Sequence, residues 1–249
     1  MKLHRRIAAL FGYELIKKRK LNDTLEQHLG NLLTLLEINC AIDVGANKGQ
    51  YGQMLRRCGY AGRIVSFEPL ADAYDELVKV SRDDADWQAH NVALGREGGV
   101  RTINRLASSD FSSFLEPNSY AVERFKWRVD VTERRDVQIV TLASVWADVA
   151  KGIAQPRAFL KLDTQGFDLE VLEGAGDVLD CVVGIQSEIS TKPIYKDMPG
   201  YLRSLTEFDR RGFEVTGLYP VTRAKESLAL IELDCVMRRR TTAQHSPSA

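Results

Sequence analysis

The sequence has no surplus of either charge, because 34 lysines and arginines balance 34 aspartates and glutamates over 249 residues. Proteins that bind nucleic acid through its phosphates usually carry a basic excess, so this balance gives no argument for a nucleic-acid partner. Cysteine is scarce as well. Its four copies are scattered and form no C-x-x-C pair. The absence of such a pair disfavours both a zinc ligand set and a redox dithiol.

Long hydrophobic runs are also missing. No apolar stretch approaches the roughly 20 residues that a membrane-spanning helix needs. The first apolar patch, Ile7 to Phe11, is short and is followed by the basic run Lys17 to Lys20, which does not fit a signal peptide. We therefore expect a cytoplasmic protein. The length and the hydrophobic content of 44% favour one large α/β domain over two small ones.

The most informative stretch runs from Cys40 to Gly52. A short apolar run ends in Asp43 and is followed by Gly45, Gly49 and a helical pattern. This is the order strand, tight turn, helix. Glycine allows unusual backbone dihedrals and the close approach of a ligand at such a turn. The helix that follows offers free N–H groups to an electron-rich ligand.

The glycine spacing separates this turn from two well-known nucleotide loops. The dinucleotide pattern G-x-G-x-x-G fails because Asn47 stands at its second glycine, and the phosphate loop fails because Lys48 precedes Gly49. Asp43 would be a poor neighbour for a pyrophosphate but suits a ligand with a cationic amine or sulfonium group. A structural turn without any ligand is the alternative.

A second acid stands at the end of the next predicted strand. The apolar run Arg63 to Phe67 ends in Glu68, roughly twenty residues beyond the glycine turn. At this spacing a carboxylate receives the ribose hydroxyls in a βαβ nucleoside site. We therefore predict that Glu68 contacts a ligand.

Four segments in this order carry a family resemblance: residues 43–49 (DVGANKG), 67–69 (FEP), 91–95 (NVALG) and 161–166 (KLDTQG). Together they resemble the FkbM-type family of S-adenosylmethionine-dependent O-methyltransferases, over about residues 38–237. The resemblance implies S-adenosylmethionine as cofactor. It also implies an acceptor hydroxyl on a sugar, in a polysaccharide, a glycolipid or a natural-product glycoside.

Short apolar runs alternate with helical stretches from Ile38 onward. This alternation, with the resemblance, predicts an α/β fold of the doubly wound, Rossmann-like class I methyltransferase type. Its sheet is expected to be mostly parallel with an antiparallel edge strand contributed by a final hairpin. We assign residues 38–240 to the methyltransferase domain and residues 241–249 to a disordered tail. Between Gly98 and Val140 we expect strands that flank a serine-rich loop.

Residues 1–37 are predicted to form an N-terminal helical extension. Thr24 is a candidate cap for a helix that carries Leu25, Leu29, Leu32, Leu33 and Leu36. We favour packing of this extension on the domain. The alternative is peripheral contact between its basic segment and an anionic membrane surface or a lipid-linked substrate.

The strand ends and the resemblance together define the predicted site. The cofactor-binding set is Asp43, Gly45, Ala46, Asn47, Gly49, Tyr51, Glu68, Pro69, Asn91, Ala93 and Asp163. The serine-rich segment lies near the open side of the site in this family, and loops at this face of a sheet usually contact the substrate. Ser109, Ser112 and Ser113 are therefore the predicted substrate-binding residues.

A sugar hydroxyl is a weak nucleophile that needs a general base or a metal. By position and by the family motif, Asp163 is the first candidate for the base and Glu188 is a second catalytic carboxylate. The pair could also hold Mg²⁺ through oxygen ligands. The family pattern K-I-D-x-E-G-x-E has Gln165 and Asp168 in its acid positions here. The missing carboxylate at Gln165 weakens the argument for a metal cage, so we predict no metal ligands.

Two other classes of function remain open. A nicotinamide-dependent sugar oxidoreductase is disfavoured by the glycine spacing and by the lack of a Y-x-x-x-K pair after the turn. A catalytically silent cofactor-binding module is disfavoured by Asp163 and the serine-rich loop. The expected partner is a small-molecule or lipid-linked glycan acceptor. The oligomeric state is not predicted.

Overall fold

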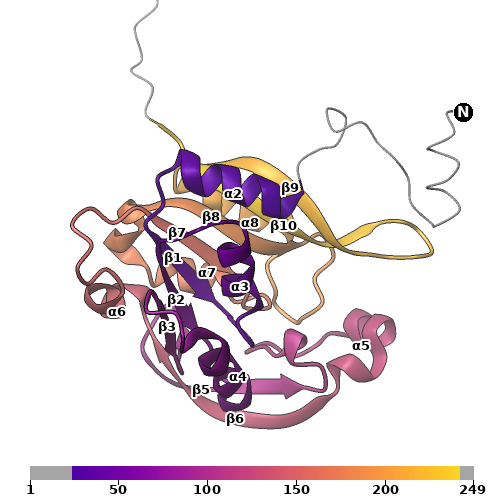
Figure 1. Cartoon of the computed structure of the whole chain (residues 1–249). Helices are drawn as coiled ribbons and strands as arrows, with labels where there is room; N and C mark the ends of the chain where they lie inside the picture. Colours follow the sequence, from indigo (N-terminus) through magenta and orange to yellow (C-terminus); the bar gives the residue numbers. More distant parts are fainter. Residues whose placement is uncertain (1–23, 242–249) are drawn as a thin grey trace, which may run out of the picture.

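The computed structural model describes residues 24–241. Its centre is a seven-stranded sheet in the order β3-β2-β1-β7-β8-β10-β9 (Figure 1). The strands are β1 (Cys40–Val44), β2 (Arg63–Phe67), β3 (Trp87–His90), β7 (Ala158–Leu162), β8 (Val182–Ser190), β9 (Phe213–Arg223) and β10 (Leu230–Arg239). The strand order reverses between β1 and β7, which confirms the predicted doubly wound, mostly parallel sheet.

The predicted hairpin closes one side of the sheet, and its antiparallel strand is the inner one. β10 pairs antiparallel with both β8 and β9, so the edge strand β9 runs parallel to the rest. Burial explains this arrangement. β10 is buried along most of its length, whereas β9 is mostly half-buried or exposed. The more apolar strand takes the place that is covered on both sides.

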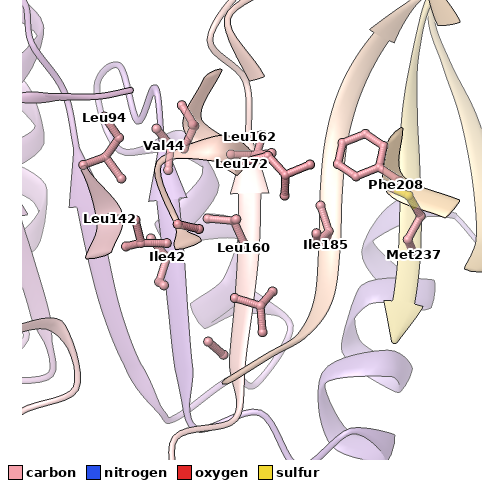
Figure 2. Close-up of a cluster of buried hydrophobic side chains, with 14 of the residues drawn as sticks. Ile42, Val44, Leu94, Leu142, Leu160, Leu162, Leu172, Ile185, Phe208 and Met237 are labelled. Carbon is pink, nitrogen blue, oxygen red and sulfur yellow. The ribbon is translucent and has the colours of Figure 1, made fainter. Parts of the chain in front are cut away.

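Two layers of helices cover the sheet (Figure 1). On one face lie α2 (Leu25–Leu35), α3 (Gln50–Arg57) and α4 (Ala71–Ser81), and on the other lie α6 (Leu142–Val149), α7 (Asp168–Glu173) and α8 (Tyr201–Arg210). Successive residues of β1 point to opposite faces, so Ile42 packs with the second group of helices and Ala41 with the first. Figure 2 shows the second face, where Ile42, Leu160 and Ile185 lie on neighbouring strands.

Helix α2 begins at the predicted cap. Thr24 Oγ1 accepts the Gln27 N–H, and Gln27 Oε1 accepts the Thr24 N–H, each at 3.2 Å. This reciprocal pair is a capping box. Leu29, Leu32 and Leu33 are buried against the sheet, as expected for an extension packed on the domain. The predicted amphipathic segment before Thr24, its basic run and the disordered tail lie outside the described residues, apart from Thr241.

The segment between Gly98 and Val140 forms, together with the preceding β4, a second, three-stranded sheet in the order β4-β6-β5. Its strands are β4 (Ala93–Leu94), β5 (Gly99–Leu106) and β6 (Val131–Val140), and the connection between β5 and β6 holds the short helices η2 (Ser109–Phe111), α5 (Ser119–Phe125) and η3 (Lys126–Val129). The short helix η4 (Gly176–Cys181) precedes β8. Within residues 24–241, no helix combines the length and the apolar character needed to cross a membrane.

Candidate active site

The carboxyl ends of β1, β2, β7 and β8 border one cavity of about 430 Å³, which is the size of a small-molecule site. Most of the residues predicted from the sequence line it. They are Gly45, Ala46, Asn47, Tyr51, Glu68, Pro69, Ala93, Ser109, Ser112, Ser113, Asp163 and Glu188. Asp43, Gly49 and Asn91 lie just outside this lining. The structure thus gathers residues from distant parts of the chain around one hollow.

The turn after β1 requires glycine at its first position. Gly45 has φ of 74°, and a Cβ on this residue would lie 2.0 Å from the carbonyl oxygen of Asp163. Any side chain would therefore push apart the turns that follow β1 and β7. Gly49 also has positive φ, 85°, and forms the N-cap of α3. A Cβ there would meet the Val80 side chain at 2.7 Å, so Gly49 serves helix packing.

Glu68 fastens the end of β2 to the glycine turn. Its Oε2 accepts the Asn47 N–H at 2.8 Å, and its Oε1 accepts the Leu70 N–H at 2.9 Å. The side chain is buried, and this burial raises the pKa of Glu68 to about 7 although both N–H groups oppose the rise. Each carboxylate oxygen has a further lone pair for a ligand hydroxyl on the cavity side.

Asn91 holds the backbone of the turn that contains Glu68. Its Nδ2 donates to the carbonyl oxygens of Glu68 at 2.9 Å and Pro69 at 3.1 Å. The backbone of the turn after β2 is therefore held by a side chain outside the cavity. The structure gives Asn91 a positioning contact, whereas Pro69 and Ala93 face the hollow directly.

A buried ion pair lies beneath the glycine turn. Lys161 Nζ lies 3.1 Å from Asp43 Oδ1, 3.4 Å from Asp163 Oδ2 and 3.2 Å from the Gly45 carbonyl oxygen. Burial alone would lower the pKa of Lys161, but the two carboxylates outweigh it and raise that pKa. Asp43 is fully buried, so the structure places Lys161, and not a ligand, against the carboxylate predicted to meet a cationic group.

Asp163 is the more exposed member of this group. Its side chain is 35% accessible, Oδ2 faces Lys161 and Oδ1 accepts Gln165 Nε2 at 3.1 Å. Gln165 in turn accepts the hydroxyl of the buried Tyr195 at 3.0 Å. The amide that replaces the family's acid therefore orients Asp163 and links it to Tyr195. Asp168 is buried and accepts from Thr164 and Ser187, so it braces the turn.

The three predicted serines differ in what they do. Ser113 is buried, donates to the Gln165 carbonyl oxygen at 2.7 Å and accepts the Leu115 N–H. Ser112 Oγ accepts the Leu106 N–H at 3.2 Å. Ser109 has no side-chain hydrogen bond among the described residues and faces the cavity. Two hydroxyls therefore shape the loop, while that of Ser109 is free to bind a ligand.

Glu188 borders two cavities. β8 extends to Ser190, so Glu188 lies within the strand, opposite Asp234 of β10. A second cavity of about 460 Å³ shares Asp110, Asp163, Gln165, Val221 and Glu188 with the first. Burial, followed by repulsion from Asp163 and Glu232, raises the pKa of Glu188. This carboxyl group stands where a ligand in one cavity would meet a ligand in the other.

Several lining residues have no counterpart in the sequence prediction. Lys161 is the clearest, since a lysine inside an apolar central strand needs a counter-ion, and that signal is readable from the sequence alone. Gln186 and Asp234 were not predicted either. The predicted Tyr51 donates to Gln186 Oε1 at 2.8 Å, and Gln186 donates to Asp234 at 2.9 Å. This chain depends on the register between β8 and β10, which the sequence does not reveal. Among the described residues, no group of three or more potential ligands has metal-binding geometry.

The sheet order and the cavity at the strand ends define a Rossmann-like protein in which an acid after β2 lines the cavity. The family model of the methyltransferase FkbM domain matches residues 43–215. The chain belongs to this family. Its predicted class, an S-adenosylmethionine-dependent methyltransferase, is thereby confirmed.

Several solved methyltransferase structures are similar to the chain at low sequence identity. The rRNA methylase of Streptococcus thermophilus is 10% identical, with a TM-score of 0.45 over 89% of this chain and 100% of its own. Magnesium protoporphyrin IX methyltransferase of Synechocystis is 7% identical, with a TM-score of 0.44 over 86% of this chain and 79% of its own. Precorrin-6y C5,15-methyltransferase of Geobacter metallireducens is 12% identical, with a TM-score of 0.42 over 91% of this chain and 97% of its own. Similarities at this level carry no argument about fold or substrate. No curated protein matches the chain.

Proposed function

We propose that this protein is an O-methyltransferase that transfers the methyl group of S-adenosylmethionine to a hydroxyl group of a sugar. The observation that carries the proposal is the position of the Glu188 carboxyl group, which lines both cavities. The first cavity fits a nucleoside cofactor, and the second is large enough for a sugar.

The residues of the first cavity fit the cofactor. Glu68 would receive the ribose hydroxyls, and the backbone at Gly45 and Ala46 would lie against the ribose and the methionine portion. An apolar wall would enclose the adenine. It consists of Phe67, Leu70, Ala93, Leu94, Ile103 and Phe114. The cofactor supplies an activated methyl group, so the protein has to position the acceptor and remove its proton.

The two candidate carboxylates suit different roles. Both carboxylate oxygens of Asp163 are already engaged, one by Lys161 and the other by Gln165, so its orientation is fixed. The raised pKa of Glu188 makes it the stronger base once it is deprotonated. We assign removal of the proton from the acceptor hydroxyl to Glu188. Asp163 orients the acceptor and balances part of the Lys161 charge.

Transfer from S-adenosylmethionine with a ¹³C-labelled methyl group tests this assignment. The acceptors are neutral and phosphorylated monosaccharides, glycolipids and natural-product glycosides, each with and without a chelator. The methyl chemical shift of the product distinguishes oxygen from nitrogen or carbon as the atom methylated. We expect an O-methyl signal and a Glu188→Gln rate about 10²–10⁴-fold below wild type. The wild-type rate should fall as pH drops through the raised pKa of Glu188.

Glu226→Gln removes the same charge from the exposed turn between β9 and β10, outside both cavities, and should keep the wild-type rate. A methyl signal on nitrogen or carbon alone would overturn the proposed acceptor class. A Glu188→Gln variant with the wild-type rate and pH profile would remove Glu188 from the mechanism. Hydride transfer with a nicotinamide cofactor, in place of methyl transfer, would favour the oxidoreductase alternative.

A further inference from the structure

The second cavity is built from segments that lie far apart in the sequence. Side chains of α5 and η3 form one wall, and side chains of the β9–β10 hairpin form another. The two walls are joined where Arg124 Nη2 donates to the Arg223 carbonyl oxygen at 3.1 Å. Buried residues of both walls, including Ala121, Val129 and Ile231, share one apolar cluster. The cavity is therefore shaped by residues that pack against one another in the core of the fold.

Three cationic side chains line this cavity: Arg124, Arg128 and Lys225. None of them lies within ion-pair distance of a carboxylate in the part of the chain that the structure describes. Many other arginines of residues 24–241 do have such a partner, for example Arg56 with Asp84 and Arg211 with Glu173. Unpaired cations gathered at one hollow indicate an anionic ligand.

Both arginines are held in place by aromatic rings. The Arg128 guanidinium lies 4.8 Å from the centre of the Phe111 ring, and that of Arg124 lies 5.9 Å from the Phe125 ring. Stacking of this kind leaves the N–H edge of a guanidinium available to an oxyanion. Arg124 Nε is buried and has no hydrogen-bond partner in the described structure. A buried donor without a partner costs free energy that a ligand oxygen would recover.

The acids of the same cavity form no ion pair with these three cations in the described part of the chain. Asp163 shares Lys161 with Asp43, and Asp110 accepts a hydrogen bond from Asn47. Glu188 and Glu232 lie deeper, and burial raises the pKa of each, so both are protonated more readily than an exposed glutamate. The cavity therefore combines an inner pair of carboxyl groups, suited to sugar hydroxyls, with an outer group of cations.

We propose that the second cavity binds a phosphorylated sugar, whose phosphate is held by Arg124, Arg128 and Lys225 while a ring hydroxyl faces Glu188. Arginine forks match the oxygen geometry of phosphate, and three cations suit a group that carries up to two negative charges. This inference deepens the proposed function and rests on it for the identity of the acceptor site. The binding of phosphate itself can be measured without any methyl transfer.

The test is a calorimetric titration of the full chain with inorganic phosphate and inorganic pyrophosphate at constant ionic strength. The protein is first saturated with S-adenosylhomocysteine, so that the first cavity is blocked. We expect saturable binding by wild type and at least a tenfold weaker affinity in the Arg124→Gln/Arg128→Gln double variant. The Arg82→Gln/Arg203→Gln double variant removes the same charge from exposed helical sites outside the cavity and should bind as wild type does.

Two further titrations identify the anion and separate the two proposals. Glucuronate, a sugar with a carboxylate in place of a phosphate, should bind more weakly than glucose 6-phosphate; tighter binding would overturn the assignment of phosphate. The assignment of phosphate would also be overturned if wild type did not bind phosphate, or if both double variants lost phosphate affinity equally. S-Adenosylhomocysteine should bind all variants equally. A failure of that binding in wild type would contradict the proposed function instead.

Discussion

At the scale of single residues, Glu68 combines a structural role with a position in the cavity lining. Its carboxylate joins the turns after β1 and β2 through the N–H groups of Asn47 and Leu70, and it borders the cavity. Its pKa of about 7 lies above the usual 4.5, so the folded protein binds this proton more tightly than the unfolded chain does. Ionisation of Glu68 therefore destabilises the fold in the absence of a ligand.

This linkage predicts how stability depends on pH. Between about pH 4.5 and pH 7, stability should fall as pH rises, and Glu68 alone contributes about 3 kcal/mol to that fall at most. Glu68→Gln cannot ionise, so its unfolding free energy should decline less over the same window, whatever its absolute value. Urea unfolding of both proteins at several pH values measures the difference in slope. Glu76→Gln, at an exposed position of α4, should follow wild type, and parallel curves for Glu68→Gln and wild type would contradict the prediction.

The sequence located the acids of the site but not their partners. Strand ends could be counted, so Asp43, Glu68 and Asp163 were expected at one edge, and the structure places them there. Which side of a turn a carboxylate faces depends on backbone dihedrals, and Asp43 faces Lys161 beneath the turn. The use of Gln165 to orient Asp163 also depends on the positive φ of Gln165, 51°.

At the scale of elements, helix α2 belongs to the same core as the sheet. Leu29 is fully buried in a cluster with Ala41, Phe159 and Val236, which come from three strands. Leu35, on the opposite side of the helix, is 68% exposed. The leucine spacing thus separates a buried stripe from a solvated face.

Leu29→Ala should lower the free energy of unfolding by about 2–5 kcal/mol, because it removes buried apolar surface and leaves a cavity. Leu35→Ala makes the same change on the exposed face and should cost less than about 0.5 kcal/mol. Chemical denaturation of both variants provides the comparison. Equal effects would show that α2 is not packed as described.

Periodicity predicted the long elements well and the short ones poorly. The strands of the parallel sheet follow the apolar runs, since strands covered on both faces are apolar throughout. Helix α5 has only seven residues, too few for a periodic pattern, and was not predicted. β5 and β6 flank the serine-rich loop, as expected, and β6 runs from Val131 to Val140 through charged residues that face solvent. β8 runs two residues past Glu188, which moves that residue from the strand end into the strand.

At the scale of the whole molecule, the doubly wound topology brings the two cavities together. Parallel strands with crossover helices place every strand end at one edge, so the first cavity follows from the strand order. The second cavity does not, because it requires contact between α5–η3 and a hairpin about a hundred residues later. Tertiary contacts of this range leave no local pattern in a single sequence.

The most direct test of the account is a calorimetric titration of the purified protein with S-adenosylhomocysteine. We expect one binding site per chain, and an affinity about ten- to a hundredfold weaker in Glu68→Gln, which loses charge-assisted hydrogen bonds to the ribose. Glu76→Gln should bind as wild type does. Absence of binding by the wild-type protein, or unchanged binding by Glu68→Gln, would contradict the central claim that this cavity holds the methyl donor.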